Sequence, residues 1–488
     1  MKRKPLMKIN GTRMKPVLYI LLIYNTLFIS EIFPLSAQTP EEIYRKPLKE
    51  VLDQVEQRFS VKLTYDIRIV QDKTVTYAPW RMKNDPEATL HAVLGPFDMV
   101  FSRNSSGGYD IAEFQYHRRT AEEGKAHLER LLSFYSTPET LEKRREELKA
   151  CIRETLGLNA FPERNSLNPI VTPKRKYKGY TTENVALETL PGVFLTGTLY
   201  RPLSGKGAIN RLVRRKEGFP AVLLAQGHGE IQHYGESSQV LAATLARMGA
   251  LVFSYDMFAK GESGLQFAFE DHRTGMAQTM QTWNSMRVVD FLLSLPETDA
   301  SRIAMTGASG GGTQTFLATL LDERIAVSVP TVMVSSWFFG GCPCESGMPV
   351  HSCGAWGTNN TEIAALAAPR HLLLISDGGD WTSTTPEIEF PFVQKVYLLT
   401  GHPGRAENAH FSTEGHDYGP SKRNAAIRFL AKHLGLSTDS VLDASGKIDE
   451  TACAVESRES MLVFGEKGEK LPAHAIRGME ALKKLLSP

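Results

Sequence analysis

The feature that most constrains this chain is a glycine-rich corner at residues 303–312. The first four residues, Ile-Ala-Met-Thr, predict a short buried strand, and the stretch after the corner predicts a helix. Between them the sequence reads Gly307-Ala308-Ser309-Gly310-Gly311. A serine that projects from so tight a turn needs neighbours without a Cβ, because a side chain there would clash with the adjoining backbone. The following helix directs its first N–H groups toward the serine. The corner therefore predicts a serine presented at the C-terminal end of a buried strand.

Apolar strands and helices alternate on both sides of this corner. The predicted strands cover residues 181–189, 193–200, 221–225, 251–255, 303–306, 326–329, 372–375 and 406–410. The predicted helices between and after them cover residues 236–248, 276–294, 311–322 and 421–434. Such alternation is typical of a mostly parallel sheet with helices on both faces. With the Gly-x-Ser-x-Gly corner, it predicts an α/β-hydrolase fold for residues 168–436.

A serine nucleophile on this fold requires a histidine base and an acid that orients it, in the chain order serine, acid, histidine. Two acids, Asp377 and Asp380, follow the next-to-last predicted strand. We favour Asp380, because the glycine pair that precedes it lets the loop turn before presenting the carboxylate, and Asp377 is the alternative. His416 precedes the last helix of the fold and is the predicted base. Its competitor, His410, lies in the last apolar strand and fits a packed residue better.

An oxyanion hole needs two backbone N–H donors near the nucleophile. Gly310, the residue after Ser309, is one predicted donor. The other is expected from His228 or Gly229, in the loop that follows the strand at 221–225. A structural role for His228 in that loop is equally compatible with the sequence. This chemistry uses no metal and no cofactor.

The N-terminus predicts an export signal. Six Lys and Arg residues lie between positions 2 and 15, an apolar run follows at 17–29, and a cut after Ala37 fits the small residue there. The alternative is an uncleaved anchor, but the apolar run is short of the roughly 20 residues that a membrane span requires. Cleavage removes six basic residues and one acid, so the formal charge of +2 changes to −3. This balance gives no electrostatic reason to expect a nucleic-acid partner, and we expect no nucleic acid and no stable membrane span after cleavage.

The 488 residues exceed one ordinary domain. Residues 38–117 predict a small α+β domain, with helices over 48–59 and from Pro86 to 94 and with strands near 61–65, 74–77, 99–102 and 109–114. This order resembles the secretin and TonB N-terminal (STN) domain. The resemblance implies a periplasmic or cell-envelope location and an envelope protein partner. Residues 118–167 predict a helical linker, and 437–488 form a polar C-terminal tail of unknown role.

Four potential metal or disulfide residues cluster between two predicted strands: Cys342, Cys344, His351 and Cys353. They could bind zinc, but their spacings lack the usual C-x-x-C pair. An exported chain favours a disulfide between two of the three cysteines, with the pairing open. Cys151 and Cys453 have no obvious partners.

The larger domain resembles the acetyl xylan esterase-like branch of the α/β-hydrolases. The strings that carry this resemblance are Thr306-Gly307-Ala308-Ser309-Gly310-Gly311-Gly312-Thr313-Gln314, Glu362-Ile363-Ala364-Ala365-Leu366-Ala367-Ala368-Pro369-Arg370 and Glu414-Gly415-His416-Asp417-Tyr418-Gly419. The resemblance implies hydrolysis of acyl esters, above all acetyl esters, on an acylated carbohydrate. The chain has Gln226-Gly227-His228 where the better-defined xylan deacetylases carry Arg-Gly-Gln, and it lacks the Cys-Ser-Arg corner of glucuronoyl esterases.

Two other functions fit parts of the sequence. A serine peptidase of the prolyl-oligopeptidase type would use the same fold and triad, but residues 38–165 are too short and too helical for its propeller. The other function is that of a catalytically idle glycan-binding envelope protein. Such a protein would need no intact triad, so the triad pattern argues against it.

Overall fold

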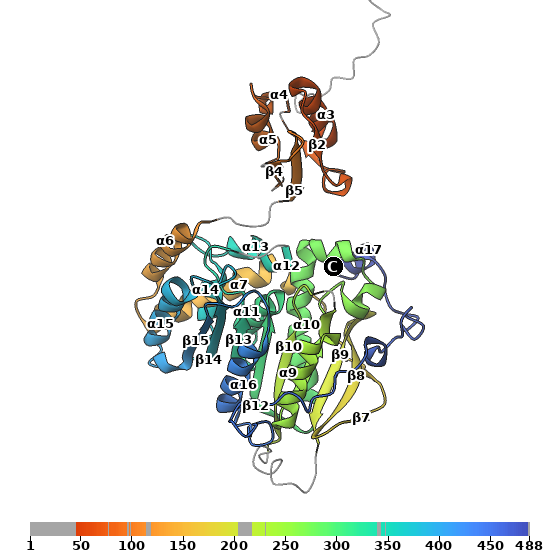
Figure 1. Ribbon diagram of the computed structural model, residues 1–488, viewed down its shortest axis with the longest axis vertical. Helices are drawn as coiled ribbons and strands as arrows, with labels where there is room; N and C mark the ends of the chain where they lie inside the picture. Colours follow the sequence, from red (N-terminus) through yellow and green to blue (C-terminus); the bar gives the residue numbers. More distant parts are fainter. Residues whose placement is uncertain are drawn as a thin grey trace, which may run out of the picture. The chain divides into compact units, whose positions relative to one another are not determined.

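The computed structural model describes residues 45–76, 78–94, 97, 99–113, 119–203, 217–229, 231–338, 343–346 and 348–486. The predicted signal peptide, residues 1–37, lies outside them. The chain divides into two compact units, residues 1–114 and 115–488 (Figure 1). Within the described residues, no helix combines the length and apolar character needed to cross a bilayer.

The first unit has the predicted α+β layout. Helices α3 (Leu48–Phe59) and α5 (Pro86–Leu94) pack on a three-stranded sheet of order β2-β5-β4. These strands are β2 (Leu63–Thr64), β5 (Tyr109–Glu113) and β4 (Met99–Arg103), and β1 (Lys46–Pro47) pairs separately with β3 (Thr74–Val75). The apolar residues at helical spacing in α3 are fully buried, which explains why the periodicity located this helix.

The second unit is built on a ten-stranded mixed sheet. From one edge to the other the order is β15-β14-β13-β12-β10-β11-β9-β8-β6, and β7 also pairs with β8. The six strands from β15 to β11 run parallel, and β9 and β8 are antiparallel additions. The bounds are β6 (Ile170–Val171), β7 (Arg175–Lys176), β8 (Tyr180–Leu190), β9 (Val193–Pro202), β10 (Phe219–Ala225), β11 (Leu251–Tyr255), β12 (Thr298–Ala308), β13 (Ile325–Thr331), β14 (His371–Asp377) and β15 (Ala406–Phe411).

Helices cover both faces of this sheet (Figure 1). The main ones are α9 (Glu236–Arg247), α10 (Gly275–Ser294), α11 (Gly310–Leu321), α15 (Phe390–Leu399) and α16 (Pro420–Leu434). Alternate residues of β14 enter different apolar clusters: Leu372 and Leu374 pack in the cluster that contains α15, and Leu373 and Ile375 in the cluster that contains α16. This alternation is what a strand buried on both faces requires. It confirms the predicted α/β-hydrolase fold.

The predicted linker is an integral part of the second unit. Helices α6 (Ala121–Leu131) and α7 (Pro138–Thr155) bury leucines in the same cluster as α11 and α15. Arg144 of α7 is 2% exposed, and its Nε lies 3.0 Å from Oε1 of the fully buried Glu362. Tyr135 and Thr358 also donate hydrogen bonds to this carboxylate. The helical pattern was therefore correct, but these helices are anchored rather than free.

Cys344 and Cys353 are both disulfide-bonded, and the bond of Cys353 is one that the sequence did not suggest. Cys151 of α7 bonds to Cys353, with the two Cα atoms 5.6 Å apart. Sequence spacing suggested no partner for Cys151, because the two cysteines lie 202 positions apart, and only the packing of α7 joins them. Cys453 is free, and Cys342 lies outside the described residues.

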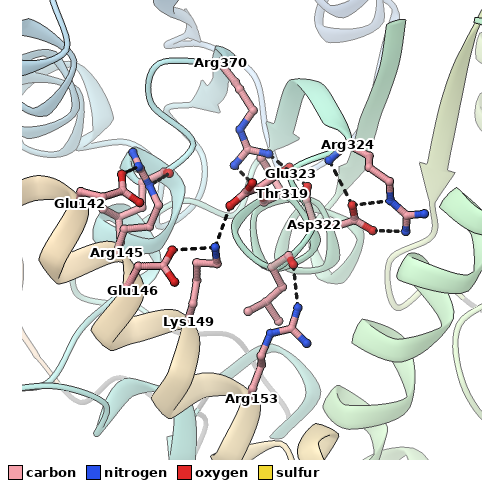
Figure 2. Close-up of polar contacts among 12 residues, drawn as sticks. Glu142, Arg145, Glu146, Lys149, Arg153, Thr319, Asp322, Glu323, Arg324 and Arg370 are labelled. Carbon is pink, nitrogen blue, oxygen red and sulfur yellow. Dashed lines mark hydrogen bonds and ion pairs between the residues drawn. The ribbon is translucent and has the colours of Figure 1, made fainter. Parts of the chain in front are cut away.

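Ion pairs add to the attachment of α7, as Figure 2 shows. Lys149 Nζ lies 2.7 Å from Glu146 Oε1 on its own helix and 2.8 Å from Glu323 Oε1 beyond the end of α11. Arg153 donates to the Leu321 carbonyl at 3.0 Å. The glutamate partners of Lys149 are solvent-exposed, so water screens these pairs more than the Arg144–Glu362 pair.

The C-terminal tail packs on the sheet as well. Val463 and Phe464 are buried against Phe194 of β9, and Leu482 of α17 (Met479–Leu486) enters the cluster that contains α7. The tail therefore covers apolar surface that the sheet would otherwise expose.

We predict that Arg144→Ala lowers the free energy of unfolding by about 3–5 kcal/mol, because it leaves the Glu362 carboxylate buried without its cation. The matched control is Lys149→Ala, on the same helix, which should cost less than about 1 kcal/mol because its partners face water. Urea unfolding followed by fluorescence measures both. Equal losses in the two variants would contradict this assignment.

A second prediction concerns His127 of α6. Asn359 Nδ2 donates to its Nδ1 at 2.9 Å, and its Nε2 contacts the Trp356 carbonyl oxygen at 3.0 Å, so the folded chain holds the neutral ring. Burial, and then the nearby Arg119, lower the pKa of His127 from 6.5 to about 4. Between these two values the unfolded chain binds a proton that the folded chain does not, so stability is full above pH 6.5 and falls as the pH drops toward 4.

In His127→Gln this loss is absent. We expect the variant to lose less stability than the parent between pH 7 and pH 4.5, by roughly 1–2 kcal/mol after allowance for solvent screening. Urea unfolding at both pH values measures the difference, and identical pH slopes for the two chains would refute the assignment.

Candidate functional site

The glycine-rich corner has the geometry that the sequence predicts. Strand β12 ends at Ala308, helix α11 begins at Gly310, and Ser309 between them has φ 56° and ψ −123°. This positive φ is unusual for a residue with a side chain. A Cβ on Gly307 or Gly311 would lie 2.6 Å or 2.4 Å from the Ala225 carbonyl oxygen of the neighbouring strand. Only glycine fits at these two positions, and Ser309 is held on the turn.

The structure separates the two acids that the sequence left as alternatives. Asp380 Oδ2 lies 2.6 Å from His416 Nδ1, and the Asp380 side chain is 2% exposed. Asp377 is fully buried and forms an ion pair at 3.1 Å with the equally buried Lys422. Burial, and next the Asp380 carboxylate, raise the pKa of Asp377 above its usual value. Of the two, it is Asp380 that contacts the histidine.

Ser309 and His416 line one cavity of about 560 Å³, together with the loop of residues 226–229 and Tyr418. The Ser309 hydroxyl donates a hydrogen bond to Glu345 Oε1 at 3.0 Å. Among the described contacts, none joins Ser309 to His416. The serine hydroxyl therefore contacts a carboxylate that sequence reasoning missed, and it shares its cavity with the predicted histidine.

The predicted oxyanion-hole residues lie around the same serine. Gly310 opens α11, so its N–H is one of the first-turn amides that no helix carbonyl accepts. His228 and Gly229 line the cavity, and a Cβ on Gly310 would lie 3.1 Å from His228 Cε1. The His228 carbonyl accepts a hydrogen bond from Lys260 Nζ at 3.0 Å. The two predicted donor segments are therefore adjacent in space.

The His228 side chain belongs to a cluster that the sequence did not reveal. Its Nδ1 lies 2.9 Å from Glu345 Oε1, and its Nε2 lies 2.9 Å from both His272 Nε2 and Cys344 Sγ. Burial, and then His228, lower the pKa of His272 to about 4. Cys344 is disulfide-bonded. No local pattern marks His272 or Glu345, because 44 and 117 positions separate them from His228.

The described members of the predicted cysteine–histidine cluster do not converge. Cys353 bonds to Cys151 on α7, and His351 Nε2 lies 2.8 Å from Asn360 Oδ1. Cys344 instead contacts His228 and His272. His410 Nδ1 lies 2.9 Å from Ser376 Oγ in the sheet, which fits the packed role favoured for it.

One aromatic side chain contacts the histidine, and a second contacts the first. The ring centroid of Trp381 lies 4.5 Å from that of His416, and Phe338 lies 4.0 Å from Trp381 on centroids. The Trp381 ring limits the access of water to one side of the imidazole.

Comparison with known proteins finds one that is similar to almost the whole chain. The solved structure of methylesterase BT1017 is 39% identical, with a TM-score of 0.72, and the match covers 92% of this chain and 98% of that one. A family described as "Glucuronyl esterase, fungi" matches residues 214–341.

Other matches are more distant or shorter. A glucuronoyl esterase from Teredinibacter turnerae T7901 is 15% identical with a TM-score of 0.47, over 71% of this chain and 98% of that one. The uncharacterized protein PA2218 of Pseudomonas aeruginosa is 28% identical over 142 residues, or 29% of this chain. The chain spans about a third of the length of this curated relative, since the match covers 34% of it.

The contacts of the two acids generate a prediction for p-nitrophenyl acetate hydrolysis. Asp380→Asn removes the carboxylate that orients His416, and we expect kcat to fall by about 10³–10⁴-fold. In the matched variant Asp377→Asn, the contact between Asp380 and His416 remains, so kcat should stay within about tenfold of the parent. An equal or larger loss in Asp377→Asn would reassign the orienting role.

Proposed function

Because this chain belongs to the same family as methylesterase BT1017, we propose that it is a serine esterase that hydrolyses methyl esters on a carbohydrate. One observation supports a methyl ester as the bond that is cleaved: the 39% identity to the methylesterase, which extends over 98% of that protein. The carbohydrate is supported by the glucuronyl esterase match at residues 214–341 and by the esterase-like strings of the sequence.

The name of the first match specifies a methyl ester, and the name of the matched family specifies an ester of glucuronic acid, which is a sugar acid. We propose a uronic acid methyl ester as the substrate class. The sugar would then remain on the enzyme as the acyl group, and methanol would leave. An acetyl ester reverses this arrangement: acetate becomes the acyl group, and a sugar hydroxyl leaves.

The proposed mechanism uses the groups around Ser309. Its hydroxyl turns from Glu345 to His416, which takes the proton as Oγ attacks the ester carbonyl. Asp380 holds the imidazole through the 2.6 Å contact with Nδ1, and it stabilises the positive charge that forms.

The negative charge on the carbonyl oxygen is stabilised by the Gly310 N–H and by an N–H near His228 or Gly229. His416 then gives its proton to the departing methoxide, and methanol leaves. Water, activated by the same histidine, releases the carboxylate and restores the Ser309 hydroxyl.

The acetyl ester is the second candidate, supported by the acetyl xylan esterase-like strings around Ser309, Glu362 and His416. The serine peptidase alternative lacks comparable support, since the described part of the first unit is a small α+β fold rather than a propeller.

We propose that the enzyme works outside the cytoplasm, in the periplasm or cell envelope. Supporting observations are the signal-like segment at residues 1–37 and the disulfide that joins Cys151 to Cys353, because such bonds persist in oxidising compartments. The STN-like nature of residues 38–117 and an envelope protein partner stay predictions.

The test measures methanol and acetate released from a methyl-esterified polyuronate and from acetylated xylan. We expect the parent chain to release methanol from the first substrate, and Ser309→Ala to release at least about 10³-fold less. The variant should keep the parent's unfolding curve, since only one oxygen is removed.

Release of acetate but no methanol would favour the acetyl ester instead. If neither product forms and a fluorophosphonate probe fails to label Ser309, the chain is the catalytically idle glycan-binding protein. Methanol release that is unchanged in Ser309→Ala would reject the assignment of the nucleophile.

A further inference from the structure

The loop that follows β10 packs directly against the nucleophile. A Cβ on Gly227 would lie 2.6 Å from the Ala308 carbonyl oxygen and 3.2 Å from Ser309 Cβ. Just before it, the Gln226 carbonyl accepts a hydrogen bond from Gln314 Nε2 of α11 at 2.9 Å. The backbone of this loop is therefore fixed beside the serine, and the direction of each peptide group decides whether it presents an N–H or a carbonyl to the substrate.

Two side chains hold the next three carbonyls of the loop. Gln232 Nε2 donates to the Gly227 carbonyl at 3.1 Å and also to the Gly229 carbonyl. Between these two, the His228 carbonyl accepts a hydrogen bond from Lys260 Nζ at 3.0 Å. Neither Gln232 nor Lys260 belongs to the predicted triad, and the mechanism above assigns them no part.

Peptide geometry shows what these contacts do to the N–H groups. In a trans peptide the carbonyl and the following N–H point in opposite directions. The His228 N–H therefore faces away from Gln232, and the Gly229 N–H faces away from Lys260. Lys260 lies in the loop after β11, and in the sheet order β12-β10-β11 it is β12 that ends next to Ser309 on the opposite side of β10. The two N–H groups are thus turned toward the side of the nucleophile.

We propose that Gln232 and Lys260 are positioning residues for the oxyanion hole. By holding the carbonyls of Gly227 and His228, they direct the N–H groups of His228 and Gly229 toward the oxygen that becomes negatively charged when the serine attacks. The inference rests on the proposed serine esterase mechanism, and it holds for either ester as substrate.

The environment of Gln232 is that of a residue fixed for a purpose. Its side chain is buried, and its Oε1 accepts a hydrogen bond from the Met257 N–H at 2.9 Å. The amide therefore links the loop after β10 to the loop after β11. Gln232 also has φ 52°, a backbone conformation that costs free energy in a residue with a side chain. The surrounding contacts maintain this strain, and the amide reaches both loops from it.

Lys260 adds a charge to the same arrangement. Its side chain is 8% exposed, and its Nζ lies 4.8 Å from the centroid of the Phe269 ring. A hydrogen bond from a cation to a carbonyl is stronger than a neutral one, and it polarises the peptide group that accepts it. Polarisation of the His228 carbonyl makes the Gly229 N–H a stronger donor. That gain is largest when the oxygen opposite is negatively charged, so it stabilises the transition state more than the bound ester.

The experiment compares Lys260→Met and Gln232→Met with the parent chain in p-nitrophenyl acetate hydrolysis. We expect kcat to fall by about 10–100-fold in each variant, less than the loss of a whole oxyanion donor, because the N–H groups remain but lose their fixed direction. KM should stay within about threefold of the parent's. The matched control is Lys149→Met, which removes a lysine that pairs with glutamates on and near α7. It should keep the parent's kcat. Circular dichroism and thermal melting check that each variant is folded.

A second measurement reports the oxyanion directly. Trifluoroacetophenone labelled at its carbonyl carbon binds a serine esterase as an adduct: Ser309 Oγ bonds to that carbon, the serine proton passes to His416, and the former carbonyl oxygen becomes an oxyanion. Carbon NMR shows the pH at which this oxyanion takes a proton. We expect a higher pH in Lys260→Met and Gln232→Met than in the parent, and an adduct that binds about 10–100-fold more weakly. A role limited to stabilising the fold would not move this pH.

Folded variants with the parent's kcat, or with an adduct that protonates at the parent's pH, would overturn the proposal. So would a parent chain that forms no adduct. A parent that forms the adduct but releases no methanol from a methyl-esterified polyuronate would reject the proposed substrate, while the higher pH in the two variants would still establish their positioning role.

Discussion

The backbone of Ser309 is the constraint on which the site depends. A residue with a side chain is held at φ 56° between a buried strand and a helix, in a region that costs of order 1–3 kcal/mol. The neighbouring strand maintains it, because β10 and β12 pair in parallel with Ala225 opposite Gly307. The Ala225 carbonyl fills the space that a side chain on Gly307 or Gly311 would need. The register of β10 against β12 therefore also determines how the serine is presented.

A second set of contacts reaches the serine from the predicted linker. Helix α7 is tied to the segment between β13 and β14 by the Cys151–Cys353 disulfide and by the Arg144–Glu362 pair. Residues 343–346, at the near end of that segment, place Glu345 against the Ser309 hydroxyl. A helix pair far from the nucleophile in sequence is therefore bonded to the same segment that supplies Glu345. The Arg144–Glu362 pair is buried, so the loss of either partner would leave the other charge uncompensated. This support is therefore strong only while both partners remain.

Periodicity and turn chemistry predicted much of this arrangement. The apolar period of α3 and α5 and the buried strands of the large sheet had a direct signal in the sequence, since each element buries its own apolar residues. The order of Ser309, Asp380 and His416 followed from the fold's chain order. The choice between Asp380 and Asp377 depended on which carboxylate meets the histidine and which meets Lys422. The pairing of Cys151 with Cys353 was missed because disulfide partners follow from distance in space, and two residues 202 positions apart gave no sign of it in the sequence.

By itself the sequence determined the corner at Ser309, the sheet that carries it, and the two candidate acids and the histidine that follow it, because each depends on local residue types and their spacing. Tertiary packing decided the surroundings of the nucleophile: Glu345 on its hydroxyl, His272 and Cys344 around His228, and α7 behind them. These contacts join residues from segments tens to hundreds of positions apart. A buried polar contact of this kind depends on the three-dimensional arrangement of distant segments, which a local sequence pattern does not specify.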